Sequence, residues 1–169
     1  MTKVKRSNHG FSLIELTIVL CIIVLIVTIT LPRLIWNDRM IMLSELNSLY
    51  TATLETQHRA LVSNTKQVLT INTSNHSYHW LGKSHFLHHA IQFGHLPGAK
   101  GPPSSPTVPI HSSCSFQRSQ IVCHPDGHID PGSAYMIGLK SNLMYALCIG
   151  VSQVSFVRKY YFNRMWKLV

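Results

Sequence analysis

The sequence predicts an α+β protein, with a long kinked N-terminal helix packed on antiparallel β-sheet. Three observations lead to this prediction. The run 11–31 is almost wholly apolar, apolar side chains at helical spacing continue to residue 61, and short strand-like runs separated by turns fill the second half. The expected parts are a leader over 1–10, a transmembrane half of the helix over 11–32, an amphipathic half over 33–63 and a β-rich globular head over 64–169.

The apolar run is long enough to cross a bilayer, because about 20 helical residues at ~1.5 Å each cover the ~30 Å hydrocarbon core. Glu15 is the one strongly acidic side chain in the run. A charge in hydrocarbon is costly, so Glu15 is a candidate functional residue. Basic residues precede the run and no small-residue cleavage site follows it. We therefore expect a retained single span with the N-terminus in the cytoplasm and the bulk of the chain outside.

The second half of the predicted helix carries an apolar stripe with steps of three, four or seven residues. Its members are Ile35, Met42, Leu46, Leu49, Tyr50, Leu54 and Leu61. Pro32 interrupts the helix and predicts a kink, since proline removes one helical hydrogen bond and pushes on the preceding turn. Asn64 is a plausible stop.

Strand signals begin after the helix. Strands are expected over 68–71, 78–81, 119–124, 134–139, 145–151 and 154–162, with turns at 72–75, 125–127, 140–142 and 152–153. The last strands form an antiparallel meander. The segment 83–93 is ambiguous, and the prolines and glycines of 94–113 predict a loop.

The charge balance is basic, with 15 Lys and Arg against 6 Asp and Glu and a formal net charge of +9. Such a surface suits nucleic acid, anionic lipid or an acidic partner, and an ordinary solvated face is an equal alternative. Outside the cytoplasm cysteines form disulfides. Cys114–Cys123, which would close a short loop, is the first expected pair and Cys123–Cys148 the second. A structural disulfide is favoured over a redox role, because the sequence has no Cys-x-x-Cys motif.

Histidines are frequent, with nine between His76 and His128. His85, His88 and His89 could present two imidazoles on one side of a helical turn, as zinc sites do, but no nearby acid completes a ligand set. Asp126 and Asp130 are the only acids after the helix, and both occupy turn sequence. We therefore expect no catalytic residue, no metal and no cofactor, and a protein that is not an enzyme.

The N-terminal motif Gly10-Phe11-Ser12-Leu13-Ile14-Glu15-Leu16, after a basic leader and before an apolar run, resembles the prepilin signal of type IV pilins and type II secretion pseudopilins. The resemblance implies cleavage after Gly10 by a prepilin peptidase, methylation of Phe11 and a helix-breaking proline such as Pro32. It also implies a filament in which Glu15 pairs with the Phe11 amine of a neighbouring subunit. Burial would make the loss of either partner strongly destabilising.

The pattern from Ile121 to Arg158 is similar to GspH/FimT-type minor pseudopilins, which carry a long helix on antiparallel sheets. This implies a minor pseudopilin of a type II secretion pseudopilus, with other pilins, an inner-membrane assembly platform and membrane lipid as partners. Its expected location is the inner membrane, with a periplasmic head, and the pseudopilus after assembly. The alternatives are a minor type IV pilin for adhesion or DNA uptake and a signal-anchored domain outside any filament. Basic side chains interleaved with aromatic ones would contact the nucleic acid, namely Arg158, Lys159, Arg164 and Lys167. An edge strand protected by lysines is the simpler explanation of that cluster.

Overall fold

The computed structural model describes residues 12–102, 105–150 and 155–169, without the side chains of 29–37. The chain divides into two compact units, Met1–Asn37 and Asp38–Val169. Helix α1 is assigned to Leu13–Ser63, and its described side chains fall into two stretches, 13–28 in the first unit and 38–63 in the second. Each unit is treated separately below.

The prediction of a long kinked helix with a transmembrane half was wrong. No helix within the described residues is both long and apolar enough to cross a membrane. The same finding contradicts the expected single-pass location in the inner membrane, with a cytoplasmic N-terminus and a periplasmic head. Pro32, the expected kink, lies outside the residues whose side chains are described.

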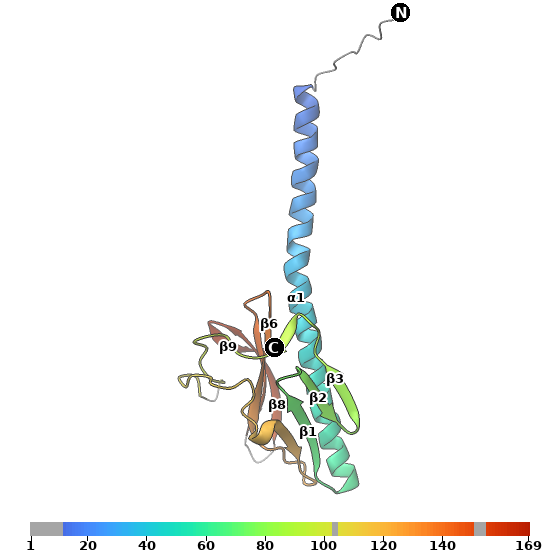
Figure 1. Ribbon diagram of the computed structural model, residues 1–169, viewed down its shortest axis with the longest axis vertical. Helices are drawn as coiled ribbons and strands as arrows, with labels where there is room; N and C mark the ends of the chain where they lie inside the picture. Colours follow the sequence, from blue (N-terminus) through green and yellow to red (C-terminus); the bar gives the residue numbers. More distant parts are fainter. Residues whose placement is uncertain (1–11, 103–104, 151–154) are drawn as a thin grey trace, which may run out of the picture. The chain divides into compact units, whose positions relative to one another are not determined.

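Two antiparallel sheets follow α1 and confirm a mixed α+β composition (Figure 1). The four-stranded sheet has the order β3-β2-β1-β5, and the five-stranded sheet has the order β4-β6-β7-β8-β9. The strands are β1 (Gln67–Asn72), β2 (Ser77–Trp80), β3 (Lys83–Phe86), β4 (Ile91–Phe93), β5 (Gln120–Cys123), β6 (Gly132–Gly138), β7 (Met144–Gly150), β8 (Phe156–Asn163) and β9 (Met165–Leu168).

Most expected strands are present, and the C-terminal meander is confirmed as β6 to β8. The expected turn at 152–153 lies outside the described residues. The ambiguous segment 83–93 forms β3 and β4, which belong to different sheets. Strand β9 was not expected. Asn64, expected to stop the helix, directly follows α1 with φ 49°, the left-handed conformation that commonly ends helices.

The main core lies between the helical stretch 38–63 and both sheets. Met42, Leu46 and Leu49 of the predicted stripe are buried, whereas Leu54 and Leu61 are exposed. These helix residues belong to one apolar cluster with members of both sheets, among them Leu69, Ile71, Tyr78, Ile121, Met136, Tyr145, Leu147 and Ile149. Helix α1 therefore holds the two sheets together in the second unit.

A second apolar cluster covers the other face of the five-stranded sheet. Tyr135, Met144 and Ala146 pack there with Ala99 from the proline-rich loop, and with Phe162 and Trp166 of the last hairpin. Strands β6 and β7 are consequently buried on both faces, which explains their nearly continuous apolar sequence. The loop expected over 94–113 contains no strand in its described residues and supplies this cover.

Candidate functional site

The described N-terminal stretch of α1 is an exposed apolar helix. Every described side chain from residue 12 to residue 28 is exposed, with Leu13 at 82% and Val27 at 44%. Its hydroxyl groups are satisfied inside the helix, because Thr17 Oγ1 donates to the Ile14 carbonyl at 2.8 Å and Thr28 Oγ1 to the Leu25 carbonyl at 2.9 Å. Apart from Glu15, the surface that remains for other molecules is therefore largely apolar.

Glu15 lies in the first turn of this helix. The Ser12 carbonyl accepts hydrogen bonds from the Glu15 and Leu16 amides at 3.0 and 3.2 Å, which starts the helix at the expected place. A carboxylate in the first turn is favoured by the helix dipole. Gly10 and Phe11, the expected cleavage and methylation residues, lie outside the described residues.

The four basic residues of the C-terminal cluster do not form one patch. On β8, successive side chains alternate between faces. Lys159 turns toward α1, where its Nζ donates to Asn47 Oδ1 at 2.8 Å and lies 4.8 Å from the Tyr50 ring centre. Arg158 is on the opposite face, against the Phe156 ring. The structure thus separates neighbours that the sequence grouped as one nucleic-acid contact.

The other two basic residues lie on the last hairpin. Arg164 forms the turn between β8 and β9 with φ 61°, and Lys167 lies on β9 opposite Tyr161. Arg164 also lines a cavity of about 500 Å³ with Lys100, Phe162, Met165 and Trp166. The Trp166 indole donates to the Lys100 carbonyl at 2.9 Å, which joins the hairpin to the proline-rich loop. Sequence reasoning missed Lys100, because it is 64 residues before Arg164.

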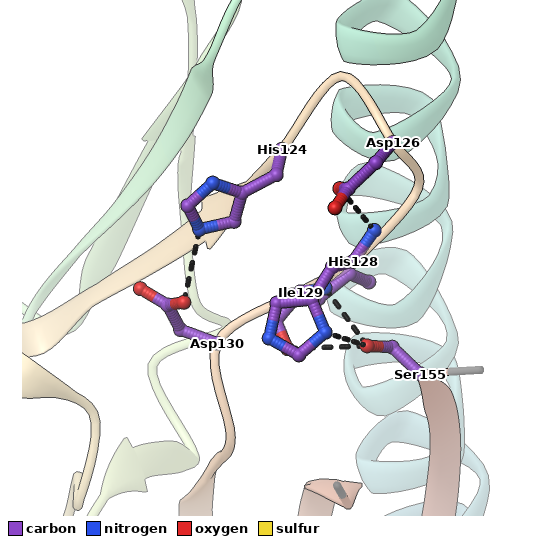
Figure 2. Close-up of polar contacts among 6 residues, drawn as sticks. All are labelled: His124, Asp126, His128, Ile129, Asp130 and Ser155. Atoms are coloured by element: carbon purple, nitrogen blue, oxygen red, sulfur yellow. Dashed lines mark hydrogen bonds and ion pairs between the residues drawn. The ribbon is translucent and has the colours of Figure 1, made fainter. Parts of the chain in front are cut away.

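The loop between β5 and β6 gathers histidine, aspartate and serine side chains (Figure 2). His124 Nε2 lies 3.0 Å from Asp130 Oδ1, whereas His128 Nδ1 lies 3.1 Å from Ser155 Oγ. Asp126 accepts a hydrogen bond from the His128 amide at 2.9 Å, the turn role that the sequence indicated. The serine and the aspartate therefore contact different histidines, which does not give a nucleophile–base–acid relay.

Ser155 has a structural partner in the same loop. Its hydroxyl accepts a hydrogen bond from the Ile129 amide at 2.9 Å and lies 3.2 Å from the Ile129 carbonyl (Figure 2). These hydrogen bonds connect the start of β8 to the β5–β6 loop. Within the described residues, no group of three or more His, Cys, Asp or Glu side chains is arranged to hold a metal ion.

The other histidine group contacts an acid that the sequence did not associate with it. His85 Nε2 lies 2.8 Å from Glu45 Oε2, and the His88 amide donates to Glu45 Oε1 at 3.1 Å. The rings of His88 and His89 lie in contact at a tilt of 36°, with centres 4.0 Å apart. Glu45 is distant in sequence, on α1, so this contact is visible only in the folded chain. It joins the helix to β3 and to the segment that follows it.

The expected Cys114–Cys123 disulfide is not formed, and Cys148 is also a free thiol. Cys114 lies beside Ala134 of the five-stranded sheet, whereas Cys123 ends β5 in the four-stranded sheet. Burial raises the pKa of all three thiols, that of Cys123 to about 12 with a further contribution from Asp130, and that of Cys148 to about 11. Buried, protonated thiols are unreactive, which suits a packing role.

Comparisons with protein-family models, with curated proteins and with solved structures find no match for this chain.

Proposed function

We propose that this chain is a structural, non-catalytic subunit of a filament, a minor pseudopilin of a type II secretion pseudopilus that serves protein secretion. The observation that supports the proposal is the exposed apolar helical stretch 13–28 with a single carboxylate in its first turn. A helix that is apolar all round belongs in the interior of a larger structure. Matching helices of other subunits would provide that interior.

Glu15 gives the assembly its specificity in this proposal. Cleavage after Gly10 would create an amine on Phe11, four residues before Glu15, and parallel helices can bring that amine to a neighbour's carboxylate. A charge pair between packed helices sets their stagger, because an unpaired buried charge costs about 3–5 kcal/mol. The partners are other pilin-like subunits, the peptidase that cleaves after Gly10, and an assembly platform.

The alternative, a minor type IV pilin that binds DNA through its C-terminal region, receives less support. Its proposed contact requires Arg158 and Lys159 on one surface, and Lys159 instead donates to Asn47 on α1.

The test is co-assembly of Glu15 variants in cells that carry a type II secretion system. Tagged Glu15→Ala and Glu15→Gln chains should be reduced more than about tenfold in the sheared filament fraction, because either change leaves the neighbouring amine unpaired. Asp38→Asn is the matched control, since it removes a carboxylate from the second unit that forms no ion pair among the described residues. Assembly of both Glu15 variants at the level of the control would contradict the proposal.

A further inference from the structure

Strand β9 is an open edge of the five-stranded sheet. It is the last strand in the order β4-β6-β7-β8-β9, and within the described residues no strand pairs with its outer side. The Val169 amide donates to the Lys159 carbonyl at 3.0 Å, and Leu168 is opposite Tyr160. Antiparallel ladders alternate, so the backbone N–H and C=O groups of Trp166 and Leu168 point away from β8. These groups are free to pair with an added strand.

Basic side chains flank this edge on both faces. Lys159 and Lys167 lie on the face toward α1, together with Arg39, whose guanidinium lies 5.9 Å from the Tyr161 ring centre. Arg158 and Arg164 lie on the hairpin as well, at the other face and at the turn. Arg39 and Arg158 each lie against an aromatic ring, and Lys159 donates to the Asn47 side-chain amide. These partners are neutral, so the positive charges remain uncompensated.

Four of the five acidic side chains of the second unit contact groups elsewhere, and the fifth, Asp38, directly precedes Arg39 on α1 and forms no ion pair among the described residues. Glu45 and Glu55 contact residues of the β2–β3 hairpin, and Asp130 contacts His124 in the β5–β6 loop. Among the ion pairs of the described residues, none includes a cation of the β8–β9 hairpin. The field at this edge is therefore positive and favours a negatively charged partner.

A second copy of the chain does not fit the edge. None of the nine strands contains an aspartate or a glutamate, so pairing with any strand of another copy brings no compensating charge. Antiparallel pairing of β9 with another β9 in the register that joins Trp166 to Leu168 would place the two Lys167 side chains opposite each other, which is unfavourable. The occupant must come from a different, acidic chain.

We propose that β9 accepts an extended acidic segment of a partner protein as a further strand of the five-stranded sheet. Strand addition uses the backbone for affinity and pockets for specificity. The cavity of about 500 Å³ beside β9, with Phe162, Met165 and Trp166 in its lining, can take an apolar side chain of the segment. The acidic side chains that alternate with it then lie on the opposite face of the sheet, the face of Lys159 and Lys167. This binding goes beyond the proposed filament role and does not depend on it.

The edge favours a peptide over a nucleic acid. The outward carbonyls of Trp166 and Leu168 need hydrogen-bond donors, which a peptide backbone supplies and a phosphate backbone does not. Phosphate oxygens facing those carbonyls would be repelled. A peptide strand instead satisfies both the donors and the acceptors of the edge.

The test measures binding of labelled peptides to the purified full-length protein by fluorescence anisotropy. The probe is a short peptide in which Glu and Val alternate, and a peptide of alternating Lys and Val is the charge control. Two further versions are N-methylated at one or the other alternate set of amides. One of them should bind about tenfold more weakly than the parent and the other should keep its affinity, because only one set faces β9.

Leu168 provides the matched protein variants. Leu168→Pro removes an outward N–H while leaving the ladder to β8 intact, and should weaken Glu/Val binding about three- to tenfold. Leu168→Ala keeps the N–H and should bind within about twofold of the wild type. The urea midpoints of both variants verify folding. If Leu168→Pro is unfolded, the affinities of the two N-methylated peptides for the wild-type protein test the proposal instead.

Three results would overturn the proposal. They are equal binding of the two N-methylated peptides, equal binding of the Lys/Val control, and tighter binding of an oligothymidylate than of the Glu/Val peptide. The last result would assign the edge to nucleic acid.

Discussion

Two glutamates of α1 show how single residues connect the helix to the sheet. Glu55 accepts hydrogen bonds from the Trp80 indole at 2.8 Å and from Lys83 Nζ at 2.5 Å, and Glu45 contacts His85 at 2.8 Å. The sequence marks both glutamates only as polar positions off the apolar stripe. Their partners are 25 to 40 residues away in the chain, so helical periodicity carries no information about these contacts.

The pH dependence of stability should report the Glu55 contact. Hydrogen bonds from Lys83 and then Trp80 hold the pKa of Glu55 below its ordinary value of 4.5. A lowered folded-state pKa stabilises the fold above the unfolded pKa, and this contribution is lost as the pH falls through the folded value. Urea midpoints of the wild type should therefore exceed those of Glu55→Gln at neutral pH and converge with them in acid.

Two lysine variants complete that experiment. Lys83→Met removes the largest cause of the lowered Glu55 pKa. It should therefore reduce the change with pH in the difference between the urea midpoints measured with and without Glu55→Gln. Lys66→Met removes an exposed lysine that makes no ion pair among the described residues, and should leave the difference unchanged. A difference between wild type and Glu55→Gln that stays constant from neutral pH into acid would contradict the assignment.

Among the elements, β6 depends on a close contact at its first residue. A Cβ added at Gly132 would overlap the ring of Phe116, which is buried. Gly132→Ala should therefore lower the free energy of unfolding by about 1–3 kcal/mol, the usual cost of overpacking. Equilibrium urea unfolding measures it. Phe116→Leu should cost less in the Gly132→Ala background than in the wild type, because the smaller side chain relieves the overlap. Additive effects would exclude this contact as the cause.

Strand prediction succeeded where the local pattern was strong and failed where it was not. The strands β1, β2, β5, β6, β7 and β8 follow apolar or β-branched runs between turn residues. Strand β9 was missed because its turn consists of Arg164 with a positive φ, a conformation that glycine or asparagine would normally signal. Strand β3 is short and largely polar and β4 has only three residues, and their pairing partners decide their conformation.

At the scale of the whole molecule, the helical stretch 38–63 packs in one core with both sheets of the second unit, and we expect the two sheets to unfold together. Leu49 is fully buried in the cluster that both sheets share. Leu49→Ala should cost about 2–5 kcal/mol, the range for buried leucine truncations. Trp80 lies in the four-stranded sheet and Trp166 in the five-stranded sheet. In variants that keep only one of these two tryptophans and also carry Trp36→Phe, the fluorescence reports on one sheet at a time.

The two fluorescence signals should give the same urea midpoint, and Leu49→Ala should shift both equally. Leu61→Ala is the control, because Leu61 is exposed on the same helix and should change either midpoint little. Midpoints that separate, or a shift seen by one tryptophan alone, would show that the sheets unfold independently.

The distribution of charged side chains over the two sheets is also a property of the whole fold. Glutamates of α1 contact the four-stranded sheet, whereas uncompensated cations line the outer edge of the five-stranded sheet. The net charge of +9 indicates a basic protein but not where the positive surface lies.

The sequence alone determined the features that depend on neighbouring residues. It placed the start and end of the helix, the stripe from Met42 to Leu49, most of the strands and the proline-rich loop, because periodicity and turn chemistry are local. Only the tertiary structure decided which distant residues meet. It brought Glu45 to His85 and turned Lys159 toward α1 while Arg158 faces away. It also kept Cys114, beside the five-stranded sheet, apart from Cys123 in the four-stranded sheet, and left β9 as an open edge. Strand pairing and helix packing set these contacts, and both depend on the whole fold.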